Sequence, residues 1–355
     1  MTPRAAPATR RTDPDVPGVV GTALGTMPGT DVVESVTLLR GELGAPHVSF
    51  LPLLPARGAA ADPVARTAAV LDGLYADAQP HGLRVSGVPG RDSRAARARL
   101  AGDVNVLADV IGAESGPDDA PVKTQLLGPL SLTAQLHLHT GERALKDHGA
   151  RRDIAHSLAS GVVEHVRAVR AAASGRDVLV QLDETELTRV LLGRLPTMSG
   201  YRTLRAVPAA EVRTSLGLVV EACREAGAAA VALRLPPGTD PRLAGEVGAD
   251  AVHVAAPTGS AHDWEPLAAL VEAGTQLWLG VVPVPPGPRG ATGANALAAD
   301  VWSVWRDLGL PAAALDLVRI TPRDELGALG PTELREVIAR VTETASMLAR
   351  TAADA

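Results

Sequence analysis

Short apolar runs recur along the chain, and the intervals between them are long enough for one helix each. Eight runs rich in Val, Leu and Ala are each closed by Gly, Pro or Asp, and they cover 19–25, 47–53, 122–128, 177–183, 229–235, 251–256, 276–283 and 317–322. Near-continuous apolar character is typical of parallel strands that are buried on both faces. Amphipathic, alanine-rich segments lie between them and predict helices over 63–78, 92–112, 150–173, 208–226, 262–273, 295–308 and 331–351.

This alternation predicts the fold class. Strands that alternate with helices form βαβ units around a parallel sheet, and eight of them predict a (β/α)8 TIM barrel. We expect one barrel domain over 18–352, preceded by a loose segment over 1–17. An open, doubly wound sheet is the alternative, but no G-x-G-x-x-G motif follows any of the runs.

Composition excludes several classes of function. Aromatic residues make up only 2% of the chain and the net charge is −6, so neither a base-stacking surface nor a broad basic surface for nucleic acid is expected. Cys223 is the only cysteine, which rules out an intramolecular disulfide and a thiolate-rich metal site within one chain. Residues 1–17 do not resemble a secretory signal and no run is long enough to cross a bilayer, so we expect a cytoplasmic protein that does not bind membranes.

The strongest candidate for function is the pair Asp183 and Glu184, which ends the fourth apolar run. In a barrel this position lies at the face where active sites are built. Adjacent strand residues point to opposite sides, so one carboxylate can hold an ammonium group or act as a general base. The alternative is an acid that caps a helix N-terminus.

A second candidate lies in the segment GTALGTMPGTD (21–31), at the end of the first run. Gly25 permits close approach of a ligand, and Thr26 offers a backbone N–H and a hydroxyl. The alternative is an ordinary turn into a helix capped by Thr30 or Asp31. We predict Gly25, Thr26, Asp183 and Glu184 as substrate-binding residues.

The remaining candidates carry weaker signals. His137 and His139 lack further metal ligands nearby, His156 and His165 are expected to face solvent or cap a helix, and His253 lies within a strand. Cys223 is expected to be a buried small hydrophobe, and Arg57 either clamps an anion or lies in a solvated loop. The long loops 184–207 and 283–294 are candidate lids over the mouth of the barrel, with a plain surface excursion as the alternative for 283–294.

The order of motifs resembles the cobalamin-independent methionine synthases, most closely their single-barrel members. The segments that carry the resemblance are GTALGTMPGTD, LPLLPARGAAAD, QLLGPLSL, VQLDETEL, LPTMSGY, GADAVHVAAP and LVRITPRDELGAL, spread over about residues 18–350. The resemblance implies a barrel that transfers a methyl group from a methyltetrahydrofolate to the sulfur of homocysteine, which a zinc ion held by His, Cys, Glu and Cys binds as a thiolate. It also implies that Asp183 holds the substrate amine and that Gly25 and Thr26 match the family's Gly-Ser.

The zinc ligands are missing at the matching positions. Leu233 and Leu235 stand where the family has His-x-Cys, Ala255 replaces the glutamate, and Asp324 replaces the second cysteine. Leucine and alanine cannot ligate a metal, so we predict no metal site and no bound cofactor. We expect these positions to have become an apolar cluster beside an acidic rim.

Two interpretations remain open from the sequence. In the first, the chain is a metal-free barrel that binds a small amino-acid or folate-like ligand and has lost the family's reaction. In the second, it is an active methyltransferase, or an enzyme like the uroporphyrinogen decarboxylases, that works without zinc through Asp183 and Glu184. The oligomeric state is left open.

Overall fold

The computed structural model describes residues 18–115, 119–259, 261–285 and 293–354. Eight parallel strands form its main sheet: β1 (Val20–Gly21), β2 (Ser49–Phe50), β5 (Val122–Leu127), β6 (Val178–Asp183), β7 (Ala230–Arg234), β8 (Ala251–Ala255), β9 (Gln276–Val282) and β10 (Val318–Pro322). All eight coincide with the apolar runs of the sequence. The predicted loose segment 1–17 lies outside the described residues, as do residues 286–292 of the candidate lid 283–294.

The sheet closes on itself. Its strand order is β1-β10-β9-β8-β7-β6-β5-β2, with every pair parallel. The two end strands are joined by backbone hydrogen bonds from Val48 N to Gly21 O (2.9 Å), from Leu53 N to Gly25 O (2.9 Å) and from Met27 N to Leu53 O (2.8 Å). The predicted (β/α)8 TIM barrel with a single domain is confirmed, and the open sheet is excluded.

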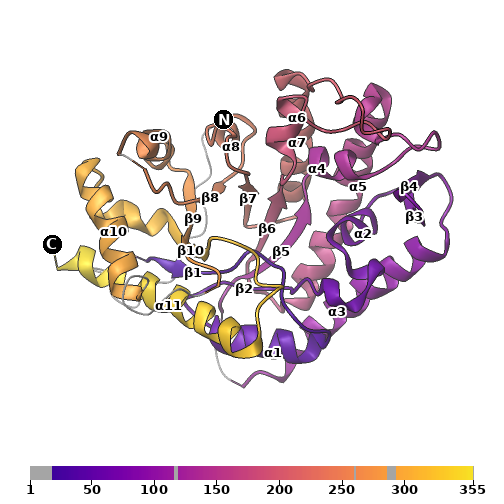
Figure 1. The fold of residues 1–355 in the computed structure, drawn as a ribbon. Coiled ribbons are helices and arrows are strands. Elements are labelled where there is room, and N and C mark those ends of the chain that lie inside the picture. The colour runs from indigo at the N-terminus through magenta and orange to yellow at the C-terminus, as the bar shows by residue number, and fades with distance from the viewer. Residues whose placement is uncertain (1–17, 116–118, 260, 286–292, 355) are drawn as a thin grey trace.

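Helices surround the barrel (Figure 1). They are α1 (Val32–Glu42), α2 (Pro63–Ala68), α3 (Arg91–Ala113), α4 (Pro129–Gln135), α5 (His148–Ala172), α6 (Leu187–Leu191), α7 (Ala209–Glu225), α8 (Leu243–Glu246), α9 (Glu265–Glu272), α10 (Ala294–Asp307) and α11 (Pro331–Ala353). Within the described ranges, no helix combines the length and the apolar character needed to span a membrane.

Side chains of the barrel strands alternate between an outer core, against the helices, and an inner core inside the barrel. Leu182, Leu233 and Ile320 face outwards and join the large cluster that packs against the helices. The inner face holds a smaller cluster in which Trp278 is fully buried against small residues such as Ala232. Because the strand period is two, alternate residues face the two sides, and β1, β6, β7, β8 and β9 each place a residue in the inner cluster.

The predicted helix over 63–78 is wrong in its second half. Helix α2 ends at Ala68, and Tyr75–Gln79 forms strand β3, which pairs in antiparallel register with β4 (Gly82–Ser86). The two strands are joined by Pro80 and His81, and Gly82 adopts a φ of +129° that favours glycine. The turn Pro80–Gly82 therefore closes a β-hairpin where the alanine content of the segment had suggested a helix.

Helix α1 was not among the predicted helices. Its N-cap is Asp31, whose Oδ1 accepts a hydrogen bond from Glu34 N at 3.0 Å. The alternative interpretation of 21–31, a turn into a capped helix, is thus correct for the end of that segment.

Candidate functional site

A cavity of about 240 Å³ opens at the carboxyl ends of the strands, where barrel active sites are built. Its apolar wall includes Leu24, Leu53 and Leu127. Its polar lining comes from loops and strand ends far apart in the sequence: Thr26, Asp62, Gln125, Gln135, Asp183, Thr185, Arg234 and Glu325. Three of the four predicted substrate-binding residues, Gly25, Thr26 and Asp183, line this one cavity.

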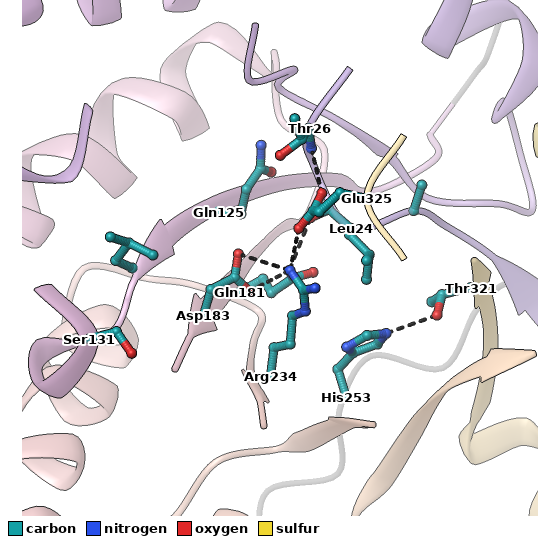
Figure 2. A network of polar contacts seen from close by, with 12 residues as sticks. Leu24, Thr26, Gln125, Ser131, Gln181, Asp183, Arg234, His253, Thr321 and Glu325 are labelled. Atoms are coloured by element: carbon teal, nitrogen blue, oxygen red, sulfur yellow. Dashed lines mark hydrogen bonds and ion pairs between the residues drawn. The ribbon is translucent and has the colours of Figure 1, made fainter. Parts of the chain in front are cut away.

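A row of three charged side chains crosses the cavity (Figure 2). Arg234, at the end of β7, forms an ion pair with Glu325 Oε1, and its Nη1 lies 3.8 Å from Asp183 Oδ2. Glu325 Oε2 in turn accepts a hydrogen bond from Thr26 N at 3.1 Å. The row therefore connects the loop after β1 with β6, β7 and the loop after β10.

Burial and the neighbouring charges shift the pKa values of Asp183 and Arg234 in opposite directions. Burial raises the pKa of the Asp183 carboxyl to about 6, although Arg234 favours the ionised form. Burial also works against the charge of Arg234, but Asp183 and Glu325 together raise the pKa of its guanidinium. At neutral pH the row consists of two carboxylates around one guanidinium.

The floor beneath this row is a buried hydrogen-bonded chain. Lys123 Nζ donates to Ala23 O (2.6 Å), Leu24 O (2.8 Å) and Gln181 Oε1 (2.7 Å). Gln181 Nε2 then donates to Asp183 Oδ1 at 2.6 Å. Although burial lowers the pKa of Lys123, three acceptors around Nζ match the three N–H groups of an ammonium, so the geometry holds Lys123 charged.

Gln125 lines the cavity and carries an unused acceptor. Its Nε2 donates to Leu51 O at 2.7 Å, whereas its buried Oε1 has no hydrogen-bond partner among the described residues. Gly25 makes room for this side chain, because a Cβ at Gly25, whose φ is +144°, would overlap Gln125. A buried carbonyl oxygen without a donor is costly, and a ligand N–H would satisfy it.

Glu184 does not line the cavity. Its carboxylate accepts hydrogen bonds from Leu130 N (2.9 Å), Ser131 N (2.8 Å) and Ser131 Oγ (2.7 Å) at the start of α4. Gly128 is required beside it, since a Cβ there would overlap the Glu184 carboxylate. The capping alternative therefore describes Glu184, while Asp183 on the opposite face of the strand lines the cavity.

Of the four positions matched to zinc ligands, only Leu235 and Ala255 share an apolar lining, so the expected apolar cluster forms only in part. Leu233 packs in the core against the helices, and the residue that faces the cavity is Arg234 between the two leucines. Asp324 is exposed, and Leu235 and Ala255 line a separate cavity together with several prolines. These side chains do not fit a zinc ion, because Leu233, Leu235 and Ala255 offer no donor atom and the side chain that faces the cavity from β7 is the cation Arg234.

His137, His253 and Arg57 take part in packing and internal pairing. His137 packs edge-on against His81 with ring centroids 5.0 Å apart, and no group of three or more His, Cys, Asp or Glu in the described part of the chain is arranged to hold a metal. His253 Nε2 lies 2.9 Å from Thr321 Oγ1 inside the barrel. Arg57 is neither an anion clamp nor solvated, since it pairs with Asp103.

The prediction for His165 is wrong, whereas those for His156 and Cys223 are correct. His165 is buried, with Nε2 3.0 Å from Thr124 Oγ1 on β5. His156 on the same helix is exposed. Cys223 is fully buried in α7, and burial raises the pKa of its thiol to about 12, so it is an inert packing residue.

The prediction missed Lys123, Gln181, Arg234 and Glu325 in the charged row and the floor, and the polar lining residues Asp62, Gln125, Gln135 and Thr185. One signal was available. Lys123 and Gln125 on one strand, like Gln181 and Asp183 on the next, are spaced by two within apolar runs, which puts both polar side chains on one face. Two neighbouring strands with such pairs indicate a polar barrel interior.

Comparisons with known proteins give the following. No protein-family model matches the chain, and no curated protein does. Among solved structures, the chain is similar to a B12-independent methionine synthase from Shewanella sp. W3-18-1 in complex with selenomethionine, with 14% identity, a TM-score of 0.46, and coverage of 70% of this chain and 67% of that one. It is also similar to a GH113 β-mannanase from Alicyclobacillus acidocaldarius, with 12% identity, a TM-score of 0.43, and coverage of 96% and 97%. Neither similarity is close enough to indicate function.

Proposed function

We propose that this barrel is a metal-independent, methionine synthase-like protein that binds a small α-amino acid in the cavity at its mouth. The proposal rests mainly on one observation: the same cavity is lined by Asp183, with its carboxylate, and by Gln125, whose Oε1 has no hydrogen-bond partner among the described residues. Both are acceptors, and an ammonium group carries three donors that can satisfy them.

The donors of the cavity complement the other end of an amino acid. Thr26 N–H and the Arg234 guanidinium belong to residues that line the same cavity, and both can bind a carboxylate. A volume of about 240 Å³ lies below the range of about 300–1,000 Å³ typical of pockets for larger ligands. The size therefore favours a free amino acid over the folate-like ligand.

A second function is favoured by the electrostatics of Asp183. A carboxyl group with a pKa of about 6 exchanges protons readily near neutrality and suits general acid–base catalysis. Glu184 is not available as its partner, because three hydrogen bonds hold its carboxylate at the start of α4. Zinc-free enzymatic chemistry would therefore depend on Asp183 alone.

Calorimetric titration of L-methionine and L-homocysteine into the wild-type protein and the Asp183→Asn variant tests the proposal. Loss of a charge-assisted hydrogen bond costs about 1.5–3 kcal/mol, so we expect affinity to fall roughly 10- to 100-fold. Asp153→Asn, an exposed acid on α5, is the matched control and should bind like the wild type. Equal binding by Asp183→Asn would contradict the proposal, whereas methylation of homocysteine that is lost in Asp183→Asn would favour the second function.

A further inference from the structure

Glu325 occupies the donors that a ligand carboxylate would need. Its Oε1 pairs with the Arg234 guanidinium, and its Oε2 accepts the hydrogen bond from Thr26 N. The two carboxylate oxygens are thus engaged by one cationic and one neutral donor, which lie on opposite sides of the carboxylate (Figure 2). This is the arrangement in which a protein binds the carboxylate of a small molecule.

The charges of the site also indicate that a ligand carboxylate takes the place of Glu325. With the Lys123 ammonium beneath it, the row of two carboxylates and one guanidinium is balanced in charge, so a third carboxylate added to it would give the site a net negative charge. If the entering carboxylate replaces Glu325, however, the count stays the same and Arg234 keeps two anionic neighbours. An anionic group is therefore accommodated by exchange, not by addition.

Glu325 is placed so that it can leave. It follows β10 in a segment without helix or strand, and its side chain is 36% exposed, compared with 13% for Asp183 and 19% for Arg234. Rotation of an exposed side chain towards solvent requires no change in the barrel, whereas Asp183 and Arg234 lie on strands β6 and β7 and are fixed by their register.

We infer that Glu325 is an internal ligand that occupies the carboxylate half of the cavity and is displaced when an amino acid binds. This inference rests on the proposed function, because it assumes that the amine end of the ligand lies at Asp183. Glu325 lowers the affinity for ligands that carry a carboxylate, since only the fraction of molecules with Glu325 turned out can bind them. A ligand with an amine and no carboxylate does not compete with Glu325.

The test compares two probes of nearly identical shape, L-methionine and its decarboxylated analogue 3-(methylthio)propylamine. Removing the charge in Glu325→Gln should strengthen L-methionine binding about tenfold, because the competent fraction rises. The amine should bind Glu325→Gln no more tightly than the wild type, because a negative charge has been lost. Glu325→Ala, which removes both oxygens, should change both affinities in the same directions.

Asp324→Asn is the matched control, because it removes the charge of an exposed acid next to Glu325. Among the described residues, Thr26 N and the Arg234 guanidinium form their hydrogen bonds with Glu325 and not with Asp324. The affinity of this variant for L-methionine should stay within about twofold of the wild type. The inference is wrong, and the proposed function stands, if L-methionine binds the wild type but binds Glu325→Gln and Glu325→Ala no more tightly. The same conclusion follows if the affinity of the amine rises as much as that of L-methionine. If neither probe binds any of the proteins, both are wrong.

Discussion

The ammonium of Lys123 on β5 lies 2.7 Å from the side-chain oxygen of Gln181 on β6. This contact fixes the orientation of the Gln181 amide, because the oxygen must face the donor and the nitrogen is left to donate to Asp183. The buried lysine thus acts on the cavity without lining it.

Replacing Lys123 with methionine should destabilise the protein by about 2 kcal/mol or more. The substitution leaves Ala23 O and Gln181 Oε1 buried without this donor, and each such acceptor costs about 1–3 kcal/mol. Chemical denaturation measures the effect. Lys146, whose side chain is 62% exposed, gives the control, since Lys146→Met should change stability by less than about 0.5 kcal/mol. Similar stabilities for the two variants would contradict the role assigned to Lys123.

Gly128→Ala should destabilise the barrel by about 2–4 kcal/mol, because the new methyl group displaces the Glu184 carboxylate from three buried hydrogen bonds. Gly102→Ala is the opposite case. Gly102 is exposed on α3 with open space around its Cβ position, so alanine should stabilise the helix by about 0.5–1 kcal/mol. Thermal unfolding distinguishes the two, and equal shifts would show that Gly128 does not serve Glu184.

Amino-acid binding should strengthen as the pH rises from 5 to 7. Burial raises the pKa of Asp183 to about 6, so its ionised fraction grows from about one tenth to about nine tenths over this interval, whereas the ammonium of an amino acid stays protonated. We expect the dissociation constant of L-methionine to fall about tenfold, measured by calorimetry at constant ionic strength. An affinity that is flat or that falls with rising pH would show that the Asp183 carboxylate does not receive the amine.

The purified protein should contain zinc well below one ion per chain, and chelation should leave its melting temperature unchanged. The physical reason is the side chain that faces the cavity from β7: it is the cation Arg234, and its neighbour Leu233 faces the helices. Elemental analysis together with thermal unfolding in EDTA measures this. One tightly bound zinc per chain would overturn the assignment of a metal-independent site.

Apolar runs were enough to predict the barrel strands, because burial on both faces is a local property of each run. The hairpin β3–β4 escaped prediction since its strands are half-exposed and Tyr75–Gln79 is rich in alanine. The opposite directions of Asp183 and Glu184 follow from strand geometry. The pairing of Arg234 with Glu325, which lie 91 positions apart, depends on barrel closure and cannot be read from either segment alone.

A crystal structure of the protein with bound L-methionine tests the central claim most directly. The account predicts the α-ammonium within hydrogen-bonding distance of an Asp183 carboxylate oxygen and of Gln125 Oε1. A ligand bound in this cavity with its ammonium turned away from Asp183, or bound only elsewhere on the barrel, would contradict it.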